Sequence, residues 1–204
     1  ESGRAMVAYH SVLVFNILGW SGFDRFTLPQ TLTAEERQNL PAPVLNLFDA
    51  YHGITDHNFA EYYHDAQLAK ESTLQLFNLG YCSLKHRRLA EQIFFGICAK
   101  VLKITRKMEF IPEEFRGLES MLSNTYFCNY SIFQSMPDSW AIDQLFPVMP
   151  IHRLEEEPNC RGILADITCD SDGKVDRFID QHDVKPVLEL HEFKGGDYFI
   201  AAFL

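Results

Sequence analysis

Apolar residues recur at intervals of three and four along the middle of the chain. Residues 59–80 carry such a stripe, which predicts one long amphipathic helix, and Thr55 and Asp56 precede it as candidate N-caps. A second stripe starts near Leu84, and the basic residues within 100–107 suit the end of a helix. Two long helices are therefore expected in this region.

Prolines divide the sequence on both sides of these helices. The capping-box pattern from Thr33 to Glu36 predicts one or two helical turns in a linker broken by prolines 29, 41 and 43. Pro112, at a first helical position, predicts a shorter third helix that ends at Met121. Residues 31–124 are thus predicted to form a small helical bundle.

The pattern changes to short β-branched and aromatic runs in the last part of the chain. Asp172 and Gly173 form a strong turn signal. Strands are expected at 126–133, 162–168, 185–190 and 198–204. Residues 125–204 are therefore predicted to be an incomplete β domain, mostly antiparallel, and the fold class is α+β.

Both ends of the chain are unusual for a complete protein. Between residues 5 and 15 the apolar positions are too dense for periodicity to decide, and we favour a short helix followed by a strand. The sequence opens without an initiator methionine and closes on an apolar run, which is typical of a piece of a longer protein.

Composition narrows the class of partner. A net charge of -10 argues against nucleic-acid binding, which needs clustered cations. The five cysteines show no paired or zinc-binding spacing, which favours a reduced, cytoplasmic setting and predicts no metal site. The apolar stretch at 6–18 is interrupted and shorter than the roughly 20 residues that a bilayer requires. Small molecules or proteins are the expected partners.

A thiol and two carboxylates follow an apolar strand. Cys169, Asp170 and Asp172 stand within four positions of one another. Carboxylates suit a cationic group such as a guanidinium, and a thiol beside them is able to relay a proton. The alternative is an Asx-rich turn whose carboxylates cap backbone N–H groups, with the cysteine buried as a small hydrophobe.

A second candidate site lies at the start of the chain. Glu1 is an acid suited to a protonated ring nitrogen, Gly3 permits close approach, and Arg4 suits a phosphate, so together they form a candidate cofactor edge. The alternative is a surface turn with a solvated ion pair. The eight histidines are scattered and show no metalloprotease spacing.

Longer strings of residues carry a resemblance to a known family. The stretch 133–147, FQSMPDSWAIDQLFP, the stretch 166–173, DITCDSDG, and the elements Ser2-Gly3-Arg4 and Tyr9-His10-Ser11-Val12-Leu13-Val14 occur in that family's order. In these features the chain resembles bacterial biosynthetic arginine decarboxylases over its whole length. The resemblance implies a fold-type III parent, with a (β/α)8 barrel followed by a β domain. Residues 1–30 would be the end of the cofactor barrel and the lead-in to the β domain, and the helical bundle would be an insertion characteristic of this branch.

The resemblance also implies an activity. The parent would convert L-arginine to agmatine and carbon dioxide with pyridoxal phosphate, in polyamine and spermidine biosynthesis. The cofactor lysine would precede residue 1, so this piece alone is expected to be inactive. A homo-oligomer with active sites shared across a dimer interface is implied, as is an association with magnesium.

Individual roles follow from the same resemblance. Glu1 would bond the pyridine nitrogen and Arg4 the phosphate, while Cys169 would govern reprotonation of the α-carbon. Asp170 would bind the distal cationic group of the substrate, and we expect Asp172 to join it. In ornithine-specific relatives an acid follows an asparagine on the preceding strand, whereas here Asn129 is followed by Tyr130. What replaces that acid is left open.

Two other readings remain. One is a diaminopimelate or other diamine-acid decarboxylase of the same fold type, and the helical insertion and the Cys-Asp-Ser-Asp string speak against it. The other is a non-catalytic interaction module built from a helical bundle and a β platform. A cofactor lysine upstream of Glu1 would favour the enzyme over the module.

Overall fold

The structure is a computed structural model that describes residues 10–22, 28–181 and 183–204. Its contacts divide the chain into two compact units. Among the described residues, 10–22 belong with 123–204 in a unit that contains the strands, and 28–122 form a helical unit. We call these the sheet unit and the helical unit. The α+β class predicted from the sequence is confirmed.

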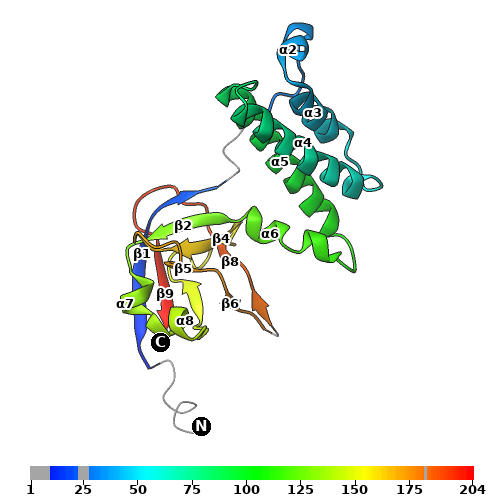
Figure 1. Ribbon diagram of the computed structural model, residues 1–204. Helices are drawn as coiled ribbons and strands as arrows, with labels where there is room; N and C mark the ends of the chain where they lie inside the picture. Colours follow the sequence, from blue (N-terminus) through cyan, green and yellow to red (C-terminus); the bar gives the residue numbers. More distant parts are fainter. Residues whose placement is uncertain (1–9, 23–27, 182) are drawn as a thin grey trace. The chain divides into compact units, whose positions relative to one another are not determined.

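Three helices of the helical unit pack side by side (Figure 1). They are α3 (Ala42–Gly53), α4 (Phe59–Asn78) and α5 (Leu84–Thr105). The short α2 (Ala34–Asn39) precedes them, and a 3-10 turn (Glu113–Phe115) and α6 (Leu118–Met121) follow. Their buried faces form one apolar core that includes Leu47, Ala66, Ile97 and Val101, all fully buried.

The helix predictions were confirmed at α2, α4 and α5, including the capping box of Thr33 and Glu36 at α2, and were partly wrong elsewhere. The cap of α4 is Asn58, because Thr55 and Asp56 form the turn that leads into it. The third predicted helix is divided in two by Gly117, and Pro112 caps only its 3-10 part. The helix α3 was missed because its prolines, at the N-cap and at N2, read as breakers although both positions tolerate them.

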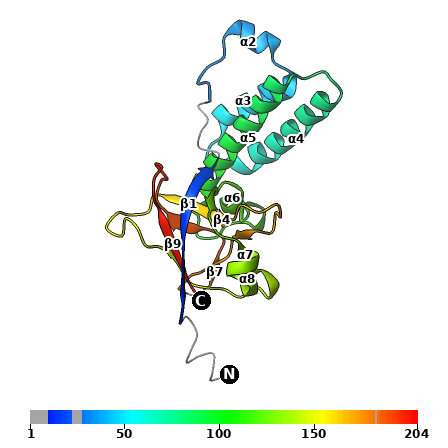
Figure 2. The same ribbon diagram turned by 90° about the vertical axis from the view of Figure 1, so that its left-hand side faces the viewer.

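The sheet unit is built on one seven-stranded sheet (Figure 2). Its strand order is β3-β9-β1-β2-β4-β5, and β8 also pairs with β4. Only β2 and β4 run parallel within this sheet, so the mostly antiparallel β domain predicted from the sequence is confirmed for the described residues. A separate two-stranded ladder joins β6 and β7.

The strands are short except for the first. Their bounds are β1 Val12–Ser21, β2 Asn124–Cys128, β3 Val148–Pro150, β4 Cys160–Ala165, β5 Lys174–Val175, β6 Phe178–Ile179, β7 Val184–Lys185, β8 Leu188–Leu190 and β9 Phe199–Phe203. Two short helices, α7 (Ile132–Ser135) and α8 (Pro137–Ala141), follow β2. The strand predicted at 126–133 starts earlier, at Asn124, and ends at Cys128, because the chain bends at residues 129–130 and α7 begins at Ile132.

Candidate functional site

The loop between β4 and β5 carries the thiol and carboxylates singled out from the sequence. The turn predicted at Asp172-Gly173 is confirmed, since β4 and β5 pair antiparallel, with Ala165 opposite Lys174. The side chains of Cys169, Asp170 and Asp172 are all exposed. We call residues 166–174 the thiol loop. These three side chains face solvent at the end of a strand whose Leu164 is fully buried.

Asp166 anchors the thiol loop at the point where the loop leaves β4. Its carboxylate is buried, with the residue only 7% exposed. One oxygen, Oδ2, accepts from the backbone N–H of Ile132 at 2.9 Å. The other, Oδ1, accepts from the Thr168 N–H at 3.2 Å and from the Thr168 hydroxyl at 2.7 Å. Asp166 was not predicted to have a role, although an acid directly after a buried strand is a signal that could have identified it.

Residues 170–173 of the thiol loop form an Asx turn. The Asp172 N–H donates to Asp170 Oδ1 at 2.9 Å, and the Gly173 N–H donates to the Asp170 carbonyl at 3.2 Å. The structural alternative considered from the sequence is therefore half correct. A carboxylate does cap the backbone, but Cys169 is exposed, whereas Cys98 and Cys128 are buried. Burial raises the pKa of Cys98 to about 12 and raises that of Cys128 as well.

The thiol loop borders a pocket of about 270 Å³. The opposite wall comes from α8 and the turn after it, so the two most distinctive strings of the sequence meet here. Arg177 pairs with Asp143 at 3.4 Å and Lys174 with Asp176 at 2.8 Å, while Asp172 has no ion pair among the described residues. The lining residues are Ser139, Trp140, Asp143, Gln144, Leu145, Asp172, Lys174, Val175, Asp176 and Arg177.

The predicted site residues are not all brought together. Asp172 lines this pocket, whereas neither Cys169 nor Asp170 is among the described residues that line it. Glu1, Gly3 and Arg4 lie outside the described residues. Tyr130, at the position where an acid was sought, is 9% exposed and stacks on Phe15 with ring centroids 4.6 Å apart. Within the described chain its hydroxyl has no hydrogen-bond partner.

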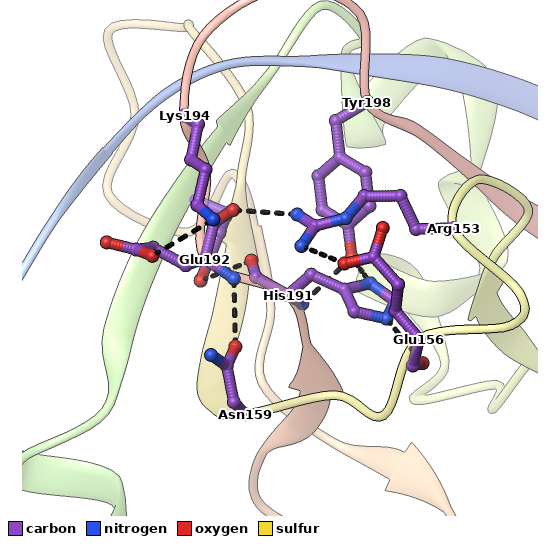
Figure 3. A network of polar contacts seen from close by, with 8 residues as sticks. Arg153, Glu156, Asn159, His191, Glu192, Lys194 and Tyr198 are labelled. Atoms are coloured by element: carbon purple, nitrogen blue, oxygen red, sulfur yellow. Dashed lines mark hydrogen bonds and ion pairs between the residues drawn. The ribbon is translucent and has the colours of Figure 1, made fainter.

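A second polar cluster, which the sequence analysis did not identify, lies around His191 (Figure 3). His191 is 2% exposed, and its Nε2 lies 2.9 Å from the Glu156 carbonyl. Because that carbonyl only accepts, Nε2 carries the proton, and Nδ1 accepts from the Tyr198 hydroxyl at 2.9 Å. The same hydroxyl accepts from the His191 N–H at 3.0 Å. Both ring nitrogens of His191 therefore have hydrogen-bond partners.

Arg153 closes this cluster. Its φ of 57° is unusual for a residue other than glycine. The guanidinium donates to the Glu192 carbonyl at 2.9 Å and to the Glu156 carboxylate at 2.5 Å (Figure 3). The hydrogen bond from Arg153 holds the pKa of Glu156 below its ordinary value. The hydrogen bonds of this cluster therefore join the segment 153–159 to the segment 191–198.

The described part of the chain carries neither a metal-ligand cluster nor a membrane-spanning helix. No group of three or more His, Cys, Asp or Glu side chains there is arranged to hold a metal ion. No helix there is both long and apolar enough to cross a bilayer.

Comparison with known proteins identifies the relatives of this sequence. Residues 37–119 match the family model of the arginine decarboxylase helical bundle domain. Biosynthetic arginine decarboxylases from Thermosynechococcus vestitus and Gloeobacter violaceus are 52% and 49% identical to the chain over its whole length. The chain spans 31% of the length of each of these relatives.

A solved structure agrees with the sequence matches. The crystal structure of the biosynthetic arginine decarboxylase from Campylobacter jejuni superposes with a TM-score of 0.70 at 33% identity. The match covers 97% of this chain and 30% of that protein. Both the helices and the sheet therefore have counterparts within one solved structure.

Proposed function

We propose that this chain is part of a biosynthetic arginine decarboxylase, an enzyme that converts L-arginine to agmatine and carbon dioxide, and the relatives that it matches support this proposal. The product would enter polyamine biosynthesis. The observation that carries the proposal at the level of residues is the thiol loop, which exposes a thiol and a carboxylate side by side on a stem fixed by Asp166.

Asp170 is proposed to bind the guanidinium of the substrate. Its Oδ1 already accepts the Asp172 N–H, which fixes the carboxylate and leaves Oδ2 without a partner among the described residues. A guanidinium offers several N–H donors in one plane and pairs strongly with a carboxylate held in this way. Asp172, on the pocket side of the same turn, adds negative charge nearby.

Cys169 is proposed to supply a proton. Loss of carbon dioxide leaves an electron pair on the α-carbon of arginine, and transfer of the Cys169 S–H proton to that carbon completes agmatine. The thiol would regain its proton from solvent. Since Cys169 and Asp170 are adjacent and exposed, a second copy of the protein is able to receive both into one site, which is the proposed reason for self-association.

Pyridoxal phosphate is the proposed cofactor, and when bound it would supply a ring that accepts electrons from the α-carbon. Glu1, Gly3 and Arg4 are the residues proposed to hold it; they lie outside the described residues, so no step is derived through them. The lysine that attaches the cofactor is proposed to lie outside this sequence. A stoichiometric adduct on a lysine within residues 1–204 after borohydride reduction would contradict that assignment.

The test is arginine decarboxylation by a protein of the relatives' length that contains this sequence, supplied with pyridoxal phosphate. Cys169→Ala is expected to lower kcat by about 10²-fold or more, the usual contribution of a positioned acid. Asp170→Asn is expected to raise KM for arginine by about tenfold or more, since it removes a charged hydrogen-bond partner. Asp172→Asn should have a smaller effect.

Cys160→Ala is the matched control, because it removes a half-buried thiol from the other end of the same strand. It should leave both constants unchanged. Full activity in both the Cys169→Ala and Asp170→Asn variants would overturn the residue roles. Turnover of diaminopimelate but not of arginine would instead favour the related decarboxylase, and turnover of neither would favour a non-catalytic module.

A further inference from the structure

The anchoring of the thiol loop is more specific than a turn of its length requires. Asp166 follows β4 directly, and its two carboxylate oxygens accept three hydrogen bonds from two separate segments. A buried carboxylate is costly unless its oxygens are satisfied, and the three donors satisfy them here. Ile132 is 34 residues away, at the start of α7, so this carboxylate joins α7 to the thiol loop.

The two ends of the thiol loop, at Asp166 and Gly173, are also hydrogen-bonded to each other. The Asp166 backbone N–H donates to the Gly173 carbonyl at 2.7 Å. A Cβ placed on Gly173 would lie 2.0 Å from Asp166 Oδ1, so only glycine permits this approach. The Thr168 hydroxyl, which donates to Asp166, lies 3.5 Å from the Asp170 carbonyl. Thr168 and Asp170, on either side of Cys169, are therefore held by one set of contacts around Asp166. We call the hydrogen bonds of Asp166 with Ile132, Thr168 and Gly173 the clasp.

We propose that Asp166 and Thr168 are positioning residues, which fix the Cys169 thiol and the Asp170 carboxylate for reaction with arginine. The inference rests on the proposed function and deepens it. Neither side chain needs to touch the substrate. Their effect passes through the backbone of residues 168–170, and a displacement of about 1 Å at a reacting group costs on the order of 10²-fold in rate.

Thr168 allows a clean test, because two substitutions differ in one group. Thr168→Val keeps the branched shape and removes the hydroxyl that donates to Asp166, whereas Thr168→Ser keeps the hydroxyl and removes a methyl group. In the full-length enzyme, Thr168→Val is expected to lower kcat/KM by about tenfold, the contribution of a hydrogen bond to a charged group. Thr168→Ser should restore kcat/KM to within about twofold, since the bond is kept.

Asp166→Asn tests the other half of the clasp. In the asparagine variant an NH2 group replaces one carboxylate oxygen, and it would face a backbone N–H of Ile132 or Thr168. Two donors cannot pair, so one of the bonds to Ile132 or Thr168 must be lost. We expect kcat/KM to fall by about 10²-fold. Amide hydrogen exchange at Ile132 or Thr168 should accelerate by at least about tenfold, because a protecting bond is gone. Thr168→Val should leave exchange at Ile132 unchanged.

The outcomes separate this inference from the proposed function. Wild-type enzyme that does not turn over arginine would refute the function and with it the catalytic purpose of the clasp, while exchange at Ile132 would still report whether the clasp exists. With active wild-type enzyme, two results would overturn the inference. One is unchanged exchange in Asp166→Asn, and the other is a loss of activity in Thr168→Val that Thr168→Ser does not restore.

Discussion

The helical unit and the sheet unit both bury polar side chains, but they satisfy them in different ways. In the helical unit, the hydroxyls of Thr73 and Thr105 donate to carbonyls three or four residues earlier in their own helices. In the sheet unit, Asp166 and His191 bond to residues 34 and 35 positions away. Buried polar groups in the helical unit are therefore locally satisfied, whereas those in the sheet unit define how distant segments fit together.

This difference bears on function. An apolar core tolerates exchange of similar side chains, because burial is not directional. A buried carboxylate or imidazole is directional, and each donor must arrive at the right place. The thiol loop stands on such a directional base, so the candidate site depends on contacts of a kind that the buried threonines Thr73 and Thr105 do not make. We therefore expect the helical unit to act as a scaffold in which similar apolar side chains replace one another at little cost.

The largest expected effect tests whether the two units are energetically separate. Ile97 is fully buried in the helical core, and Ile97→Ala should cost about 2–5 kcal/mol of the free energy of unfolding. Both tryptophans, Trp20 and Trp140, belong to the sheet unit, so their fluorescence reports on that unit while far-UV circular dichroism is dominated by the helices.

Urea unfolding followed by both signals is the measurement. In Ile97→Ala the dichroism transition should move to lower urea while the fluorescence transition stays in place. Ile97→Val, with an expected cost of about 0.5–1.5 kcal/mol, provides the graded control. If both transitions shift together, the two units unfold as one and the comparison between them fails.

A smaller effect is expected from the polar cluster of the sheet unit. Tyr198→Phe removes the hydroxyl that donates to His191 Nδ1 and accepts the His191 N–H, which leaves two buried groups unpaired. The cost should be about 1–3 kcal/mol. It should appear in the tryptophan transition and not in the helical one. Tyr81→Phe, at a residue that is 77% exposed, should change neither.

The smallest effect concerns the start of α2. The Thr33 hydroxyl accepts the Glu36 N–H, and Glu36 accepts the Thr33 N–H in return. Thr33→Ala should cost about 1 kcal/mol of local helix stability. The bond from the Thr33 backbone lowers the pKa of Glu36 below its ordinary value of 4.5. A lowered carboxyl pKa stabilises the fold at neutral pH, and this contribution is lost as the pH falls below 4.5.

Amide exchange at Thr33 would follow this loss on acidification. Protection should be constant at neutral pH and should fall as Glu36 becomes protonated. In Glu36→Gln the profile should be flat, because the amide oxygen still accepts and no longer titrates. A pH dependence that survives in Glu36→Gln would assign the change to another group.

Much of the fold followed from the sequence, because its determinants are local. The apolar stripes of α4 and α5 and the Asp172-Gly173 turn each lie within a few residues of what they determine. The prediction missed α3, since its two prolines occupy positions that a helix tolerates. It placed the cap of α4 at Thr55 or Asp56 instead of Asn58, because all three residues are good caps.

The chemistry divides in the same way. The sequence alone singled out Cys169, Asp170 and Asp172 as a cluster and indicated the family. Only the tertiary structure showed that Asp166 joins this loop to the start of α7, that Asp172 faces a pocket bordered by α8, and that His191 is buried within a closed hydrogen-bond network. The physical reason is the separation in sequence between the interacting residues. A motif is a local pattern and is visible in the sequence. A buried polar group finds its partners only when segments that are distant in sequence, such as β1 and β9, come together in the fold.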